Sequence, residues 1–351
     1  MLATSVGAGP ASAASNAVVP GTATCPQVSD AYSSAVLADS PIAYYRLDET
    51  SGTTMCDSSS SANNGTYNAS GLTYGAAGAL ASSSDTAISA DGTSSGLVGQ
   101  SNSDPTGLTG NHGFTLEAWF KNAEHSTNNG EPNPYNNHVL AAIGLPCSNG
   151  GQFCSGSAFS PSPGGVAALT LYPNHNAQLA RGPTSCFGID QNSGDYCWDA
   201  STVMSNLWDG NWHYLAVTYD ASAKTFTGYV DGHDLGAPVA DQYGNPAVNI
   251  ASAPIRLGQW ADGSYSPSTH GYFYPLIGSL DEATVYPAAL SSARIEAHWT
   301  AALGLPGAPT IGTATGGNAS ASVSFSPPSS TGGSAITSYT VTSTDTTNSA
   351  H

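Results

Sequence analysis

Short apolar segments separated by polar loops dominate this chain. They are rich in aromatic and β-branched residues, and Gly, Asn, Ser and Pro bound them. In one of them, Leu215, Val217 and Tyr219 alternate with other residues, which places the three on one face of a strand. Many short strands without helices between them predict an all-β fold, an antiparallel β-sandwich. The segments are PIAYYRLDE, FTLEAWFK, HVLAAIG, GVAALTLY, WHYLAVTYD, TFTGYVDG, PIRLGQW and YPLIGSLDEATVY.

One segment has helical periodicity instead. In LSSARIEAHWTAALG, Ile295, Trp299 and Ala302 fall on one helical face. Ser291 is the expected N-cap, and Gly304 is expected to end the helix. We expect this short C-terminal helix to pack across the edge of the sandwich.

Composition divides the chain into four parts. Residues 30–303 contain the strand segments and the helix, and residues 304–309 form a Pro/Gly-rich linker. Residues 310–351 contain further strand-like segments, but a complete small sandwich needs about 100 residues, so a partial module is expected. Residues 1–29 are rich in small residues, and Ala11–Ala13 fits a signal-peptide cleavage pattern. They indicate an export-signal remnant and a flexible arm, with a plain Ala/Ser arm as the alternative.

The charge of the chain excludes some partners. Six Lys and Arg stand against 24 Asp and Glu among 351 residues, a net charge of -18. This balance argues against nucleic acid and against anionic membrane surfaces, both of which attract basic patches. No apolar run approaches the roughly 20 residues of a membrane span. A polar surface built mainly from Ser, Thr, Asn and Gly suits a secreted or cell-surface protein.

The cysteines predict disulfides. Their number, six, is even, and the chain has features of export. Zinc binding would need close C-x₂₋₄-C pairs, which the sequence lacks. Two pairs of cysteines are close in sequence and are expected to bond across short loops, and the two remaining cysteines form the third pair. The expected pairs are Cys147–Cys154, Cys186–Cys197 and Cys25–Cys56.

Two adjacent acids, Asp281 and Glu282, stand in the middle of a strand-like segment. In a regular strand they point to opposite faces, whereas a glycosidase needs two acids that face one sugar. The E-x-D-x-x-E spacing of some β-sandwich glycanases is absent, as are H-E-x-x-H, G-x-S-x-G and P-loop motifs. We therefore assign no catalytic residue. A buried Glu282 would need a partner, for which Arg46 and Arg256 are candidates.

Aromatic residues in or beside loops are candidates for ligand binding. Sugars stack their apolar faces on aromatic rings, while Asp and Asn side chains accept hydrogen bonds from their hydroxyls. A structural role at the edge of the sandwich is the alternative for each ring. The candidate residues are Tyr196, Trp198, Trp208, Trp260, Tyr265 and Tyr272.

Seven motifs occur in an order that resembles the laminin-G-like, concanavalin A-like jelly-roll family of bacterial surface proteins. They span residues from about 30 to 303, and the region 122–200 is longer than the family pattern. The tail resembles the first half of a fibronectin type III module, with Phe325 at a position that commonly holds Trp. The seven motifs are PIAYYRLDETSGTT, NNGTY, FTLEAWFK, WHYLAVTYD, YVDG, RLG and GSLDEATVYPAALSSARIEAHW.

The resemblance implies a jelly roll that binds carbohydrate or protein, often holds structural calcium and is usually not an enzyme. It also implies that the last strand runs near the N-terminal segment, where Asp48 and Asp57 could converge with Asp281. Ca²⁺ would then be held by these carboxylates and by backbone carbonyls. The alternative is that Asp281 caps a turn or faces water.

The expected function is that of a non-catalytic, extracellular binding or adhesion domain within a larger protein. Its expected ligand is a glycan or an extracellular protein. One alternative is an accessory carbohydrate-binding domain of a glycoside hydrolase whose catalytic unit lies outside this chain. The other is a structural spacer without a ligand.

Overall fold

The structure is a computed structural model. For residues 138–139, 142–143, 167–172, 186–191 and 194–199 it describes the backbone alone. The described residues are 25, 29–68, 70–81, 84–91, 98–103, 113–121, 138–143, 167–172, 186–191, 194–199, 207, 209–240, 254–258, 276–306, 308–318, 320–328, 336–340 and 342.

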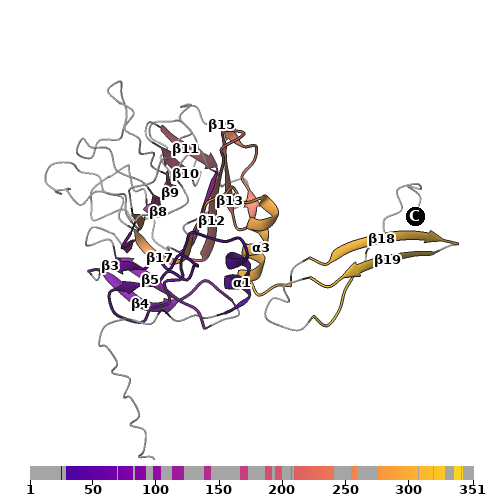
Figure 1. Cartoon of the computed structure of the whole chain (residues 1–351), viewed down its shortest axis with the longest axis horizontal. Coiled ribbons are helices and arrows are strands. Elements are labelled where there is room, and N and C mark those ends of the chain that lie inside the picture. The colour runs from indigo at the N-terminus through magenta and orange to yellow at the C-terminus, as the bar shows by residue number, and fades with distance from the viewer. Residues whose placement is uncertain are drawn as a thin grey trace, which may run out of the picture.

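Two antiparallel sheets make up the main body (Figure 1). The strands of the first sheet are β1 (Ala43–Tyr45), β4 (Leu72–Ala77), β5 (Thr86–Asp91), β7 (Phe114–Lys121), β12 (Trp212–Asp220), β13 (Thr225–Val230), β14 (His233–Asp234), β15 (Val239–Ala240) and β17 (Ile277–Tyr286). The strands of the second sheet are β2 (Thr54–Met55), β3 (Gly65–Tyr67), β6 (Gly99–Ser101), β8 (His138–Ile143), β9 (Ala167–Tyr172), β10 (Cys186–Gln191), β11 (Gly194–Asp199) and β16 (Ile255–Leu257).

The order of the strands brings distant segments together. The first sheet runs β14-β13-β12-β7-β17-β5-β4, with β1 paired to β17 and β15 paired to β13. The second sheet runs β11-β10-β9-β8-β16-β6-β3-β2. All the described pairings within both sheets are antiparallel. The predicted antiparallel β-sandwich is therefore confirmed.

The first sheet is buried on both faces, as β7 at its centre shows. Phe114, Leu116, Ala118 and Phe120 of β7 belong to the core between the two sheets. Trp119 belongs to a second apolar cluster on the outer face of the first sheet. Two helices complete this second cluster, so the polar positions of β7 are also shielded from water.

The two helices lie side by side over the outer face of the first sheet (Figure 1). They are α1 (Ala31–Ala38) and α3 (Ser292–Ala302). The sequence predicts α3, but it packs on the face of the sheet together with α1 and not across the edge of the sandwich. Ser291 precedes α3 as expected, although its side chain makes no capping hydrogen bond. Gly304 follows α3 with a φ of 67°, the left-handed conformation that commonly ends a helix.

Helix α1 was not expected from the sequence. Its N-cap is Asp30, whose Oδ1 accepts a hydrogen bond from the Ser33 backbone N–H at 2.7 Å. Ser33 Oγ accepts in return from the Asp30 N–H at 2.9 Å, which completes a capping box. This box uses Ser at its fourth position, where the usual sequence signature has Glu or Gln.

The tail forms a separate hairpin of β18 (Thr310–Gly317) and β19 (Ser320–Ser326), which extends away from the sandwich (Figure 1). The described residues of both strands are exposed, and the rings of Phe325 and Tyr339 lie 4.9 Å apart. The assignment of residues 310–351 to a fibronectin-type module stays a prediction, as do the other domain boundaries. Within the described part of the chain, no helix is long and apolar enough to cross a membrane.

Candidate functional site

A β-bulge in β17 sets the position of the two adjacent acids. Asp281 pairs with Trp119 of β7, whereas Thr284 pairs with Glu117, so β17 has one extra residue between these pairs. Glu282 lies in the bulge with a φ of 52°, in the left-handed region that non-glycine residues rarely adopt. A bulge breaks the alternation of a strand, and both acids are completely buried.

The expectation that Asp281 and Glu282 point to opposite faces is therefore wrong. One carboxylate oxygen from each of them and one from Asp85 lie within 4.8 Å of one another. We call Asp85, Asp281 and Glu282 the acidic cluster. The expectation assumed an uninterrupted pleat, and a glutamate in a left-handed conformation carries no sequence signal comparable to a bulge glycine.

The guanidinium of Arg46 is the counter-charge of this region. Its Nη2 lies 3.2 Å from Glu282 Oε1, 3.6 Å from Asp85 Oδ1 and 2.8 Å from Asp30 Oδ2. Its Nε lies 3.1 Å from Asp48 Oδ2. The Arg46 side chain is only 5% exposed, so these ion pairs are shielded from solvent. Four carboxylates thus share one buried cation.

Of the two arginines expected as partners of Glu282, the structure selects Arg46. Arg256 instead directs its Nε to Gln100 Oε1 at 3.2 Å. The sequence could narrow the partner of Glu282 to these two residues because arginines are rare in this chain. Choosing between the two required the pairing of β1 with β17, which places Tyr45 opposite Ala283.

Burial raises the pKa values of the acidic cluster. The pKa of Asp281 is well above its ordinary value because of burial, and Asp85 and Glu282 raise it further. Burial also raises the pKa of Glu282 well above its ordinary value, and Arg46 only partly offsets this rise. Burial raises the pKa of Asp85 to about 6. The cluster therefore resists carrying three negative charges near neutral pH unless a further positive charge is present.

The three residues expected to bind calcium occupy different surroundings. Asp281 is in the acidic cluster, and its Oδ2 accepts a hydrogen bond from the Ala79 N–H at 2.8 Å. Asp48 borders the cluster through Arg46, and its Oδ1 accepts from the Thr86 N–H at 3.0 Å.

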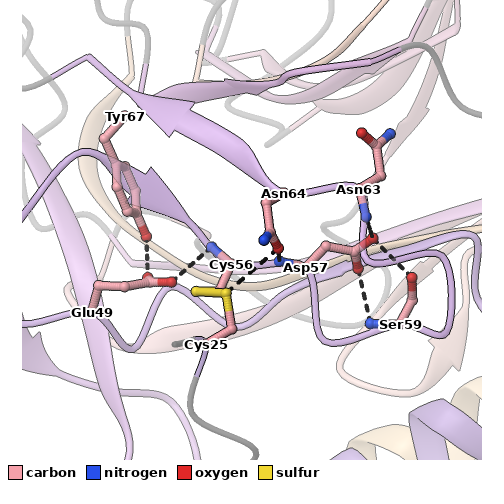
Figure 2. Close-up of a disulfide and its surroundings, with 8 residues drawn as sticks. All are labelled: Cys25, Glu49, Cys56, Asp57, Ser59, Asn63, Asn64 and Tyr67. Carbon is pink, nitrogen blue, oxygen red and sulfur yellow. Dashed lines mark hydrogen bonds between the residues drawn. A yellow bond between two sulfur atoms is a disulfide. The ribbon is translucent and has the colours of Figure 1, made fainter. Parts of the chain in front are cut away.

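Asp57 is the anchor of a turn beside the disulfide (Figure 2). Its Oδ1 accepts from the backbone N–H groups of Tyr44 and Ser59 at 2.8 and 2.9 Å. Its Oδ2 accepts from the Asn63 N–H at 2.7 Å and from Ser59 Oγ at 2.9 Å. With both oxygens engaged in this way, Asp57 has a structural role, and the acidic cluster contains Asp85 and Glu282 in place of Asp57 and Asp48.

The predicted disulfide between Cys25 and Cys56 is confirmed (Figure 2). Its Cα atoms are 5.4 Å apart, and it joins residues 31 positions apart in sequence. The Cys56 N–H donates to Glu49 Oε1 at 2.8 Å, and the Tyr67 hydroxyl donates to the other oxygen of Glu49. These contacts attach the segment before α1 to the second sheet.

The other two cysteine pairs stay predictions. Cys147 and Cys154 lie outside the described residues. The backbones of Cys186 and Cys197 lie on the paired strands β10 and β11, where Cys197 is opposite Gly188.

A second buried carboxylate, Glu117, lies on β7 beneath the helices. The hydroxyls of Tyr214 and Tyr286 both donate to it, the latter at 2.6 Å. His298 Nδ1 lies 3.0 Å from Glu117, and its Nε2 lies 2.9 Å from Asp39. Glu117 and His298 are both fully buried. This network fastens α3 to the sheet and to the C-terminal end of α1.

Sequence reasoning did not find this network. Its residues come from β7, β12, β17, α3 and the C-terminal end of α1, and no local motif connects them. The available signal was an acid in the middle of the largely apolar FTLEAWFK, because a buried carboxylate needs hydrogen-bonding partners.

His298 makes the stability of the fold depend on pH. Burial alone would lower the pKa of His298, but Glu117 and Asp39 raise it to about 9. The contribution of protonated His298 is fully present below the unfolded-state pKa of about 6.5 and is lost as pH rises through about 9. We expect the free energy of unfolding to fall by about 3 kcal/mol between pH 6.5 and 9.5.

Urea unfolding of the wild type and of His298→Gln at both pH values measures this effect. Asp231 and Asp209 also raise the pKa of His213, although burial opposes this rise. His213 therefore contributes to the pH dependence in the same direction in both proteins. The wild type should therefore lose more stability than the variant. Equal losses in the two proteins would show that His298 does not carry the pH dependence.

The aromatic candidates for ligand binding are not tested by the structure. The backbones of Tyr196 and Trp198 lie on β11, at one end of the described strand order of the second sheet. The remaining candidates lie outside the described residues: Trp208, Trp260, Tyr265 and Tyr272.

Comparison with known proteins agrees with the fold. Residues 158–296 match the family model Laminin_G_3, described as the concanavalin A-like lectin/glucanases superfamily. This region runs from before β9 into α3. Together with the two antiparallel sheets, the match defines the fold as a concanavalin A-like β-sandwich. No curated protein matches the sequence.

Several solved structures are similar in shape at low sequence identity. Domain 4 of AbnA, a GH43 extracellular arabinanase from Geobacillus stearothermophilus in complex with arabinotriose, is 16% identical with a TM-score of 0.41; the match covers 74% of this chain and 97% of that one. The binding domain of botulinum neurotoxin serotype D is 11% identical with a TM-score of 0.42; the coverages are 77% and 52%. A heptameric SAP-like pentraxin from Limulus polyphemus is 13% identical with a TM-score of 0.35; the coverages are 54% and 70%.

Proposed function

We propose that this chain is a non-catalytic, extracellular glycan-binding domain of a larger surface or secreted protein. The observation that carries the proposal is the placement of the buried carboxylates. Glu117 and the acidic cluster are buried in the sandwich and are held by hydrogen bonds and ion pairs. They are therefore committed to the fold and are not exposed to a ligand.

Glycoside hydrolysis needs an arrangement that these acids do not have. A hydrolase places two carboxyl groups on either side of the scissile bond, with room for the sugar and, in inverting enzymes, for a water molecule. Glu117 instead accepts hydrogen bonds from two tyrosines and faces His298. The side chains of α1 and α3 fill the space above it. The wrapping of this sheet by helices favours a binding role over a catalytic one.

Two further features support an extracellular binding role. The Cys25–Cys56 disulfide is typical of proteins that fold in an oxidising compartment. The family model that matches residues 158–296 is named for lectins as well as glucanases. The binding would rest on aromatic rings that stack on the sugars. Such stacking would serve equally in an adhesive domain or in an accessory domain of a glycoside hydrolase.

A glycan array with the purified full chain tests the proposal, and isothermal titration with the strongest hit then measures the affinity. Ala substitution of Trp208, Trp260 or Tyr272 should weaken binding about tenfold where the ring stacks on the sugar. Tyr339→Ala is the control, because Tyr339 lies exposed in the tail. Absence of any hit would favour the spacer alternative, whereas equal affinity in all the aromatic variants would show that these rings do not contact the glycan.

A further inference from the structure

Three Asn-x-Ser/Thr sequences occur in this chain, beginning at Asn64, Asn68 and Asn318. In exported proteins this pattern is the acceptor sequence for N-linked glycans, with the asparagine as the point of attachment. Such a short pattern also arises by chance in a chain rich in Asn, Ser and Thr. The surroundings of each asparagine therefore decide which of the three can be modified in the folded protein.

Asn64 is committed to the fold beside the disulfide (Figure 2). Its Oδ1 accepts a hydrogen bond from the Asp57 N–H at 2.9 Å. The hydroxyl of Thr66, the third residue of this acceptor sequence, donates to Asn102 Oδ1 at 2.7 Å. Strand β3, which contains Thr66, is paired on both sides, with β2 and with β6. Both groups that a transferase must engage are therefore already in use.

Asn68 is also held by the body of the sandwich. Its backbone N–H donates to the Val98 carbonyl at 2.9 Å, and the residue is half-buried. Asn68 and Ser70, the first and third residues of this acceptor sequence, both make further contacts with other residues. A glycan on Asn68 would have to displace these contacts.

Asn318 has the opposite surroundings. It lies in the turn between β18 and β19, and both Asn318 and Ser320 are exposed. Among the described residues, neither the Asn318 amide nor the Ser320 hydroxyl has a hydrogen-bonding partner. The hairpin extends away from the sandwich (Figure 1), so its turn can be approached by another protein without hindrance from the two sheets.

We propose that Asn318 is the acceptor for an N-linked glycan on the folded chain. The donor would be a sugar activated at C1 as a diphosphate ester. A bond forms between Asn318 Nδ2 and the sugar C1, while the C1–O bond to the phosphate breaks and the diphosphate leaves with its electron pair. The amide proton passes to a base of the transferase. The proposal rests on the extracellular setting proposed above, but not on the binding of a glycan ligand.

An attached glycan would suit the composition of this hairpin. Residues 304–344 contain no Lys, Arg, Asp or Glu, and the side chains of Ile311 and Val323 are 74% and 41% exposed. Exposed strand edges without charged residues tend to pair with other chains. A bulky, hydrated group at the turn would oppose such pairing, because it hinders the approach of a second hairpin.

The test uses the full chain, folded under oxidising conditions and incubated with UDP-glucose and a soluble asparagine glucosyltransferase. Peptide mass spectrometry then locates the added hexose. The wild type should gain one hexose, on Asn318, and Asn318→Gln should gain none. Ser320→Ala should also fail to react because the hydroxyl is missing, whereas Ser320→Thr should still react. Asn68→Gln is the matched control and should behave as the wild type does.

A digest of the reduced chain gives the reference without the fold, and its peptides should accept hexose at all three asparagines. A folded wild type with no hexose on Asn318 would overturn the proposal, as would a hexose on Asn64 or Asn68 of the folded chain. The glycan array should give the same hits for the modified and the unmodified chain. A failure of this proposal is therefore distinguishable from a failure of the proposed function.

Discussion

Glu117→Ala is expected to lower the free energy of unfolding by about 3–5 kcal/mol. Glu117 is the buried acceptor for Tyr214, Tyr286 and His298. Because the pKa of His298 is about 9, its imidazolium would lose its buried counter-charge at pH 7. Two buried hydroxyls would also lose their acceptor, and each unsatisfied group costs about 1–3 kcal/mol. Urea unfolding at pH 7 measures the loss.

Two variants serve as controls for this prediction. Glu117→Gln keeps a carbonyl acceptor for the tyrosines but loses the charge opposite His298, so its effect should be intermediate. Glu296→Ala removes an exposed acid of α3 and should change stability by no more than about 0.5 kcal/mol. A Glu117→Ala protein as stable as Glu296→Ala would show that the network does not fasten the helices.

Arg46→Met is the second substitution with a large expected effect, also about 3–5 kcal/mol at pH 7. It keeps much of the buried volume but leaves Glu282 and Asp85 without their cation. Burial already raises the pKa values of both acids, and the loss of Arg46 would raise them further. The two acids can then take up protons, so the deficit relative to the wild type should be smaller at pH 5 than at pH 7.

Arg294→Met is the matched control for this prediction. Arg294 also pairs with an aspartate, Asp39, but its side chain is 39% exposed. An exposed pair of this kind contributes at most about 1 kcal/mol. Similar losses in the two variants, or a deficit of Arg46→Met that grows at pH 5, would contradict a role for Arg46 as the buried counter-charge.

The sandwich itself could be predicted from sequence because its strands are short and alternate clearly. In WHYLAVTYD, the residues expected on one face, Leu215, Val217 and Tyr219, do lie in the core between the sheets. Tyr214 and Ala216, on the other face, lie in the cluster beneath the helices. The strand pattern does not reveal that helices cover this second face. One of the two helices, α1, is short and was not predicted from the sequence.

The acidic cluster could be predicted only in part. The sequence marks Asp281 and Glu282 as unusual and gives Arg46 as a candidate partner. It does not reveal the bulge, which depends on how β17 pairs with β7, nor does it mark Asp85, whose position depends on β5 pairing with β17. The Cys25–Cys56 pair was predicted because it was the one pairing left once the two pairs of nearest cysteines were matched.

The central claim is that this domain binds a glycan without cleaving it. It is tested most directly by incubating the full chain at equimolar concentration with the oligosaccharide that binds best on the array, and then analysing the sugar by mass spectrometry. We predict saturable binding and recovery of the oligosaccharide at its original mass. Shorter products that appear with the wild type and disappear with Glu117→Gln or Asp281→Asn would contradict the claim, because buried acids assigned to the fold would then be acting on the ligand.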